Sequence, residues 1–168
     1  MNSVIEARRS IRKYHKDKIV TKDQLNQLVH AAMLAPSARN SRPWEFIVIT
    51  NREILDEVAR IHPGAGMFSS INAAILVVAI EQKEPIIEGF FPQCCGAAIQ
   101  NILLEAIDMG LGTCWCGIYP KEERTATFSA MFNLAAPKIP LGIIAVGYPD
   151  DEPAMRGFFE ESKVSYIE

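Results

Sequence analysis

A short cationic segment near the N-terminus holds the residue types best suited to binding chemistry. Arg8, Ser10 and Arg12 alternate along it, so an extended backbone would turn all three side chains to one side. Ile11 would then point the other way, into the core. Two guanidinium groups with a hydroxyl between them suit a phosphate ester, because each Arg offers forked donors and a fixed charge. The segment therefore predicts a site for a phosphate-bearing cofactor.

Two other interpretations fit the same segment. Six of the eleven residues 8–18 are Lys or Arg, and such a run is most often a solvated face or a weak nucleic-acid arm. The formal net charge of the whole chain is −3, however, and Tyr14 is the lone aromatic residue of the run. A nucleic-acid binder is expected to carry a basic balance, so we expect no nucleic-acid partner.

A second polar cluster lies between two prolines, at residues 36–43. Ser37 and Asn40 offer hydrogen bonds there, two arginines offer charge, and Trp44 follows with a large flat face. The commoner explanation of such a segment is a stiff turn whose Trp enters the core. Binding loops also carry polar clusters of this kind, so both interpretations remain open.

Motifs for protein-based catalysis are missing from the sequence. It contains no G-x-S-x-G, G-x-x-x-x-G-K-[ST] or H-E-x-x-H, and none of its three histidines has an evident partner. The cysteines fall as Cys94-Cys95 and Cys114-x-Cys116, spacings that do not suit a metal, so we expect reduced, buried thiols and no metal site. An enzyme of this composition would leave the chemistry to a cofactor.

Hydrophobic periodicity and turn residues predict the elements that would position these clusters. Helices are expected over residues 2–9, 22–34, 52–61, 93–109 and 120–132, and strands over residues 46–49, 73–80, 113–117 and 139–148. The strand at 73–80 is apolar on both faces, so helices should cover both sides of the sheet. The helix at 93–109 is apolar nearly all round, which favours a second subunit over part of it.

Length and composition indicate a single domain over residues 1–168. The N-terminus reaches charged residues before any apolar run develops, so we expect no signal peptide. No apolar run approaches the roughly 20 residues that span a bilayer. The expected location is the cytoplasm, with no membrane partner.

Four motifs in this order resemble those of the nitroreductase family of FMN-dependent oxidoreductases. They are Arg8-Arg9-Ser10-Ile11-Arg12, Ala35-Pro36-Ser37-Ala38-x-Asn40-x-x-Pro43-Trp44, Gln100-Asn101-Ile102-Leu103-Leu104 running to Gly110-Leu111-Gly112, and Gly147-Tyr148-Pro149. Each motif alone is loose, but the four together are specific and span essentially the whole chain.

The resemblance implies the fold and the assembly. It predicts an α+β, nitroreductase-like α-β-α sandwich with a mainly antiparallel central sheet. It also predicts an intertwined homodimer, in which the C-terminal extension at 149–168 is swapped onto the partner subunit. Two FMN sites would lie at the dimer interface.

The resemblance also implies roles for individual residues. Arg8 would hold the FMN phosphate, Ser10 the phosphate or ribityl end, and Arg12 the N1–C2=O edge of the flavin. The loop residues would reach the ring from the other subunit, and residues 114–117 would place backbone N–H groups near N5 and O4. The full implied set is Arg8, Arg9, Ser10, Arg12, Pro36, Ser37, Ala38, Asn40, Arg42, Cys114, Trp115, Cys116, Gly117 and, from the tail, Arg156 or Lys163.

The implied activity is hydride transfer from NAD(P)H to FMN, followed by reduction of a nitroaromatic, a quinone or a similar acceptor in a ping-pong cycle. No side chain need act as a catalytic residue. A non-catalytic flavin-binding dimer, used for storage or sensing, is the alternative on the same fold. One departure bears on the site: Arg42 stands where the family often has Gln, and adds charge there. The connections at 62–72 and 81–92 are short, which is typical of a minimal family member with an open site.

Overall fold

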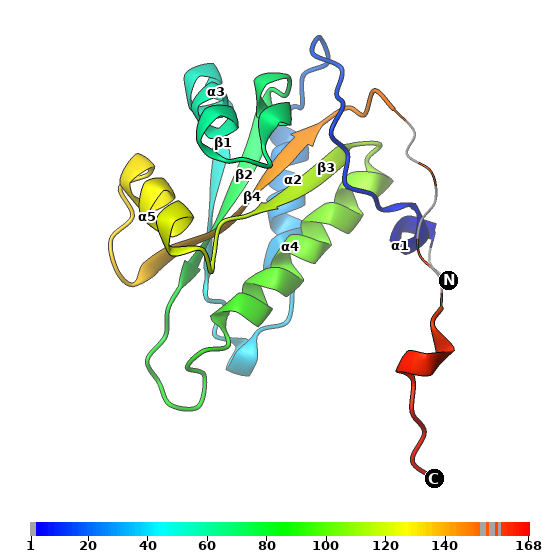
Figure 1. The fold of residues 1–168 in the computed structure, drawn as a ribbon, viewed down its shortest axis with the longest axis vertical. Helices are drawn as coiled ribbons and strands as arrows, with labels where there is room; N and C mark the ends of the chain where they lie inside the picture. The colour runs from blue at the N-terminus through cyan, green and yellow to red at the C-terminus, as the bar shows by residue number, and fades with distance from the viewer. Residues whose placement is uncertain (1–2, 152–153, 155–156, 158) are drawn as a thin grey trace.

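The computed structural model describes residues 3–151, 154, 157 and 159–168. Its centre is a four-stranded sheet of β1 (Trp44–Ile49), β2 (Ala73–Ile80), β3 (Gly112–Gly117) and β4 (Lys138–Gly147). The strands lie in the order β1-β2-β4-β3, and every neighbouring pair is antiparallel. The predicted α+β class with an antiparallel sheet is therefore confirmed, and β3 lies at one edge (Figure 1).

Helices cover both faces of this sheet, as the apolar strand at 73–80 predicted. On one face, α2 (Lys22–Met33) and α4 (Phe91–Asp108) share a core with the sheet. On the other, α3 (Arg52–Ile61), the 3₁₀ turn η2 (Gly66–Ser69) and α5 (Glu122–Met131) form the second core. β2, between the two cores, is buried along nearly its full length.

Local capping explains where two of the helices begin. Thr21 and Gln24 form a reciprocal capping box at α2: the Gln24 N–H donates to Thr21 Oγ1 at 3.2 Å, and the Thr21 N–H donates to Gln24 Oε1 at 3.0 Å. At α3, Asn51 Oδ1 accepts from the Ile54 N–H at 3.0 Å. Both helices match their predicted ranges to within one residue at each end.

Helix α4 differs from its predicted range at its start. It begins at Phe91 rather than 93, because Pro92 lies in the first turn, where a proline is tolerated. Within one chain α4 leaves an outer strip only half-buried, and a second subunit over that strip stays a prediction. The half-buried residues of the outer strip are Gly96, Ala97, Asn101, Leu104, Glu105 and Ile107. None of the described helices is long and apolar enough to cross a membrane.

The N-terminal helix α1 (Ser3–Ala7) is shorter than predicted, and residues 8–13, hereafter the basic segment, run beside the start of β3. Ser10 bridges Thr113 in parallel orientation, and Ile11 is buried at 5% exposure. Glycine permits this close approach, since a Cβ at Gly112 would lie 2.9 Å from the Ile11 side chain. The C-terminal tail, with the short 3₁₀ turn η3 (Glu161–Lys163), extends away from the body of the chain (Figure 1).

Candidate functional site

The basic segment lines a pocket of about 530 Å³, whose other walls are Asp151 and Ala154. Arg8, Arg9, Ser10, Arg12 and Lys13 all contribute to the lining. The pocket thus gathers four cationic side chains and a hydroxyl against a single carboxylate, a composition suited to an anion such as a phosphate ester. The alternation predicted from the sequence is present, because Ser10 and Arg12 are exposed while Ile11 is buried.

The arginines of this pocket differ in what they already bind. Arg9 is structural: its Nη1 donates to the backbone oxygens of Glu6 at 2.7 Å and Arg8 at 2.6 Å, and its Nε donates to Ala154 O at 3.2 Å. Arg12 Nη1 donates to Ser10 O at 3.2 Å. The guanidinium of Arg8 makes no hydrogen bond or ion pair to a described residue, so its donors remain available to a ligand.

Next to the pocket, β3 presents part of its backbone at the edge of the sheet. The Ile118 N–H donates inward to Leu141 O at 3.1 Å, whereas Thr113 O accepts outward from the Ile11 N–H at 2.9 Å. Along an antiparallel strand, the backbone N–H and C=O groups of successive residues point alternately toward the paired strand and away from it. The backbone groups of Trp115 and Gly117 therefore point outward, as those of Thr113 do. We call the backbone N–H and C=O groups of Trp115 and Gly117 the open edge, since no main-chain group of the described residues pairs with them.

The Gly117 carbonyl is the exception on that edge, because side chains reach it. His62 Nε2 lies 2.9 Å from Gly117 O, and Arg124 Nη1 donates to the same oxygen at 3.1 Å. Neither residue was identified from the sequence. The contact of His62 joins segments more than fifty residues apart, and that of Arg124 crosses the β3–α5 connection. No local sequence pattern predicts either contact.

The two cysteines of β3 face the core rather than the open edge. Both thiols are buried, and the Cys116 thiol donates to Gly64 O at 3.6 Å. The neighbouring Cys116 side chain, aided by the positive charge of Arg12, lowers the pKa of Cys114 to about 7 against the opposing effect of burial. The neighbouring Cys114 side chain and burial raise the pKa of Cys116. This part of β3 therefore offers a ligand its backbone and the half-exposed Trp115 ring, not its thiols.

The second predicted cluster, residues 36–42 and hereafter the polar loop, has an unusual backbone. Arg39, Asn40 and Arg42 have φ values of 50°, 54° and 48°. Asn tolerates this left-handed region, but each Arg costs of the order of 1 kcal/mol or more. Strain of this kind persists where surrounding contacts hold it, and it concentrates at functional sites.

The start of α4 holds the polar loop and the proline that follows it through two hydrogen bonds. The Ala38 N–H donates to Cys94 Sγ at 3.3 Å, and the Cys95 thiol donates to Pro43 O at 3.3 Å. Within the loop, Ser37 Oγ accepts from the Arg42 N–H at 3.0 Å. The predicted packing role of Cys94 and Cys95 thus has a specific form, which is to hold the loop on α4.

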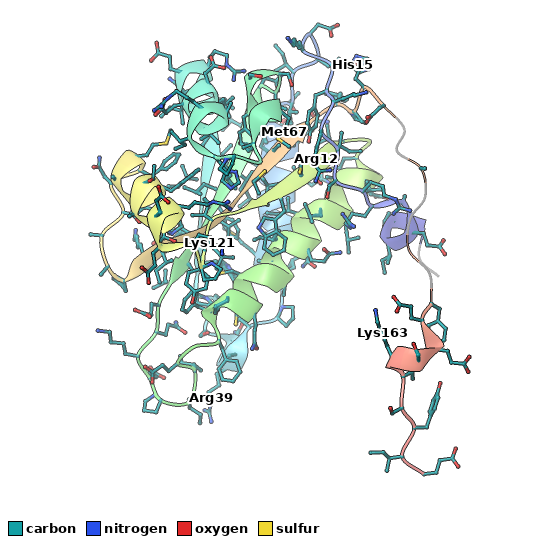
Figure 2. All side chains as sticks on the ribbon, in the orientation of Figure 1. Arg12, His15, Arg39, Met67, Lys121 and Lys163 are labelled. Atoms are coloured by element: carbon teal, nitrogen blue, oxygen red, sulfur yellow. The ribbon has the colours of Figure 1, made fainter. Side chains whose placement is uncertain are left out.

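One chain does not bring the two clusters together. Arg12 and Arg39 lie toward opposite ends of the molecule (Figure 2). Lys163, one of the two tail candidates for the phosphate, is ion-paired with Glu160 at 2.7 Å, away from the basic segment. The other candidate, Arg156, lies outside the described residues. A single chain therefore brings the basic pocket and the open edge together, but its polar loop lies away from both.

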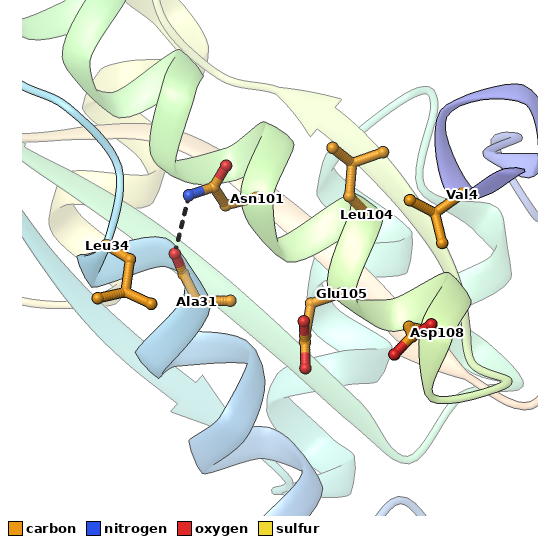
Figure 3. Close-up of a pocket in the computed structure, with 7 residues that line it drawn as sticks. All are labelled: Val4, Ala31, Leu34, Asn101, Leu104, Glu105 and Asp108. Carbon is orange, nitrogen blue, oxygen red and sulfur yellow. Dashed lines mark hydrogen bonds between the residues drawn. The ribbon is translucent and has the colours of Figure 1, made fainter. Parts of the chain in front are cut away.

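A separate pocket of about 440 Å³ lies between α1, α2 and α4 (Figure 3). It is lined by Val4, Ala31, Leu34, Asn101, Leu104, Glu105 and Asp108, and the Asn101 amide donates to Ala31 O at 2.9 Å. Its two carboxylates would repel a phosphate, and it contains none of the predicted site residues. It does not serve as the candidate site.

Comparison with known proteins agrees with these observations. The model of the Nitroreductase family matches residues 5–65 and 65–148. A protein of Methanothermobacter thermautotrophicus, named as a candidate NADH dehydrogenase/NAD(P)H nitroreductase, is 40% identical over 95% of this chain and 83% of its own length. A candidate NADH oxidase from Clostridium acetobutylicum superposes with a TM-score of 0.91 at 38% identity, covering 98% of this chain and 99% of that one. An FMN-dependent nitroreductase from Clostridium difficile superposes with a TM-score of 0.89 at 27% identity. The match covers 100% of this chain and 99% of that one.

Proposed function

Since this chain belongs to the nitroreductase family, we propose that it is an FMN-dependent oxidoreductase. It takes hydride from NAD(P)H and reduces a nitroaromatic, a quinone or a similar acceptor in a ping-pong cycle. The observation that carries this proposal is the basic pocket beside the open edge of β3. One end of that arrangement suits a phosphate, and the other offers backbone hydrogen bonds to a heterocycle.

The residues present fit FMN. Arg8, whose guanidinium has no partner among the described residues, would hold the phosphate together with the Ser10 hydroxyl. Arg12 would place a fixed positive charge beside the ring, which favours negative charge at that edge. The open edge would contribute the Gly117 N–H, and the half-exposed Trp115 an apolar surface nearby.

When bound, FMN supplies the chemistry of accepting and passing on hydride. The chain itself binds and orients. Arg8 and Ser10 fix one end of the cofactor, the open edge fixes the other, and Arg12 sets the local charge. No side chain of the site is required as a nucleophile or as a proton donor. The four cysteines are free thiols in the structure, which suits the reducing cytoplasm as the compartment.

The proposal includes a homodimer, because the polar loop would complete the site from the partner subunit. A single chain leaves apolar groups exposed around the outer strip of α4: Ile5 is 51% exposed, Met33 50% and Leu34 70%. A second copy covering this face would bury them. The C-terminal extension at 149–168 would dock on that partner, and its apolar Phe159, Tyr166 and Ile167 are exposed in one chain.

An anaerobic visible spectrum of the purified protein, recorded before and after adding NADH or NADPH, tests the proposal. We expect a yellow protein that bleaches within seconds, and the faster of the two nucleotides gives the preference. A yellow protein that does not bleach would support the alternative of a non-catalytic flavin-binding dimer. A colourless protein that takes up no added FMN would contradict the site itself.

A further inference from the structure

His62 is buried and both of its ring nitrogens are engaged. The residue is 4% exposed, and its ring meets Phe128 edge-on, with 6.2 Å between the ring centroids. Its Nδ1 accepts from the Gly64 N–H at 3.1 Å, so the ring proton must lie on Nε2. Nε2 therefore donates to Gly117 O at 2.9 Å, and the two hydrogen bonds fix the orientation of the ring.

Arg124 supplies a second donor to the same oxygen. Its Nη1 reaches Gly117 O at 3.1 Å from the first turns of α5. A carbonyl oxygen has two lone pairs, so these two donors occupy the acceptor capacity of Gly117. The loop that carries His62 is also tied to β3 beside this point, because the Cys116 thiol donates to Gly64 O at 3.6 Å.

The ladder with β4 holds Gly117 from the inner side, and these two donors add a restraint from the outer side. Gly117 is the last residue of an edge strand and is exposed, and a Cβ placed on it would meet nothing within 4 Å. Glycine without neighbouring contacts samples a wide range of backbone conformations. The two donors hold the peptide that follows Gly117 from its outer side, while the Ile118 N–H holds it from the inner side. This limits the φ and ψ rotations through which the Gly117 N–H could turn.

The restraint also changes what the open edge offers to a ligand. Once its carbonyl is occupied, Gly117 presents only its N–H. The backbone groups that remain free on the open edge are then, in chain order, the Trp115 N–H donor, the Trp115 C=O acceptor and the Gly117 N–H donor. A ligand at the C-terminal end of this edge therefore meets a donor with no competing acceptor from the same residue.

We propose that His62 and Arg124 are positioning residues that clamp the Gly117 carbonyl and thereby aim the Gly117 N–H at the ring edge of FMN. The inference rests on the proposed function, since it needs FMN at the open edge. It assigns roles to two residues outside the pocket that would act on the cofactor only through the backbone of β3.

The test uses three variants and two matched controls. His62→Phe keeps an aromatic ring against Phe128 and removes both hydrogen bonds, whereas His62→Gln retains an N–H donor. Arg124→Met keeps the length of the chain without the donor, and it leaves the core intact if His62→Phe folds poorly. The exposed residues His30 and Arg60 give the controls His30→Phe and Arg60→Met.

Two readouts are followed. The first is the backbone ¹H–¹⁵N resonance and hydrogen exchange of Gly117, with and without FMN. The second is the dissociation constant of FMN from fluorescence quenching. We expect FMN to protect the Gly117 N–H in the wild type, and the protection to fall in His62→Phe and Arg124→Met. The loss of one neutral hydrogen bond should weaken FMN binding by about fivefold, with partial recovery in His62→Gln.

Unchanged protection of Gly117 and unchanged affinity in folded Arg124→Met protein would overturn the inference. So would an equal loss in the control variants. A wild-type protein that fails to bind FMN at all would instead contradict the proposed function, so the two failures are distinguishable. A fall in thermal stability without a change in Gly117 protection would reduce both residues to a structural role and would also overturn the inference.

Discussion

The basic segment and the polar loop carry most of the predicted cofactor contacts, but different parts of the molecule hold them. The basic segment is docked on β3, where the Ile11 N–H donates to Thr113 O and Gly112 leaves room for the Ile11 side chain. The polar loop is held at the start of α4 by the thiols of Cys94 and Cys95. The two clusters, marked by Arg12 and Arg39, lie toward opposite ends of the folded molecule (Figure 2).

This difference bears on how a complete site could form. Each cluster rests on a regular element of the same packed body, so no small loop movement within one chain would join them. If both contact the same cofactor, the partner subunit must supply one of them. The predictions below either break this division of the site between two chains or sharpen it, and they begin with the largest effect.

Removal of residues 155–168 should abolish the stable dimer. This truncation keeps Ala154, whose carbonyl accepts from Arg9 Nε, so the wall of the basic pocket is preserved. We expect aggregates or unstable monomers, because the face that we propose the partner's tail to cover would be left exposed. Size-exclusion chromatography with light scattering measures the outcome, and removal of only 165–168 is the graded control. A stable, active dimer after the longer truncation would refute the swapped tail.

Arg8→Ala should weaken FMN binding by about 1.5–3 kcal/mol, the usual scale for a charged hydrogen bond. That is about a ten- to 150-fold increase in the dissociation constant. Arg60→Ala removes an equivalent charge from an exposed ion pair with Glu57, and it should leave FMN affinity unchanged. Wild-type retention of FMN by Arg8→Ala would argue against the phosphate assignment.

A mixed dimer tests the division of the site directly. Arg8→Ala and Asn40→Ala are introduced into separate chains with different affinity tags, and the heterodimer is purified through both. If the basic segment and the polar loop of one site come from different subunits, one site carries both changes and the other carries neither. FMN titration should then recover wild-type affinity at half of the sites. Impaired affinity at every site would place the two clusters of each site in the same subunit.

The sequence predicted the local parts of this arrangement well. Thr21 and the apolar run at 73–80 set the limits of α2 and β2, because capping and burial leave their marks within a few residues. The alternation of the basic segment likewise indicated correctly that Ile11 is buried. These features depend on neighbours in the chain, and periodicity reports them directly.

The features that were missed depend on contacts across the fold. The sequence places His62 beside Pro63 and Gly64, a context that suggests only a turn, yet its ring is buried and bonded to Gly117. The open edge likewise follows from the strand order and the ladder phase, which a linear pattern does not contain. The start of α4 at Phe91 was missed because Pro92 suggests a loop when its place in the first turn is unknown.

The smallest predicted effect tests how the basic segment is anchored within its own chain. The buried Tyr14 hydroxyl donates to Ile11 O at 2.7 Å, which closes the segment against β3. Tyr14→Phe should lower the free energy of unfolding of the FMN-free protein by about 1 kcal/mol at pH 8, the value of one neutral hydrogen bond.

The pH dependence of that difference provides the control. Burial, with a smaller contribution from Cys114 and Cys116, raises the pKa of Tyr14 above its ordinary value of about 10. The contribution of Tyr14 is therefore complete below pH 10 and declines as the pH rises, because only the unfolded chain releases the proton. The decline should approach about 1.4 kcal/mol per pH unit, so the stability difference between wild type and Tyr14→Phe should vanish or reverse near pH 11. Urea unfolding at the two pH values measures it, and a difference that stays constant would mean that the Tyr14 hydroxyl is not held in the interior. The hydrogen bond from Tyr14 to Ile11 O would then not anchor the basic segment.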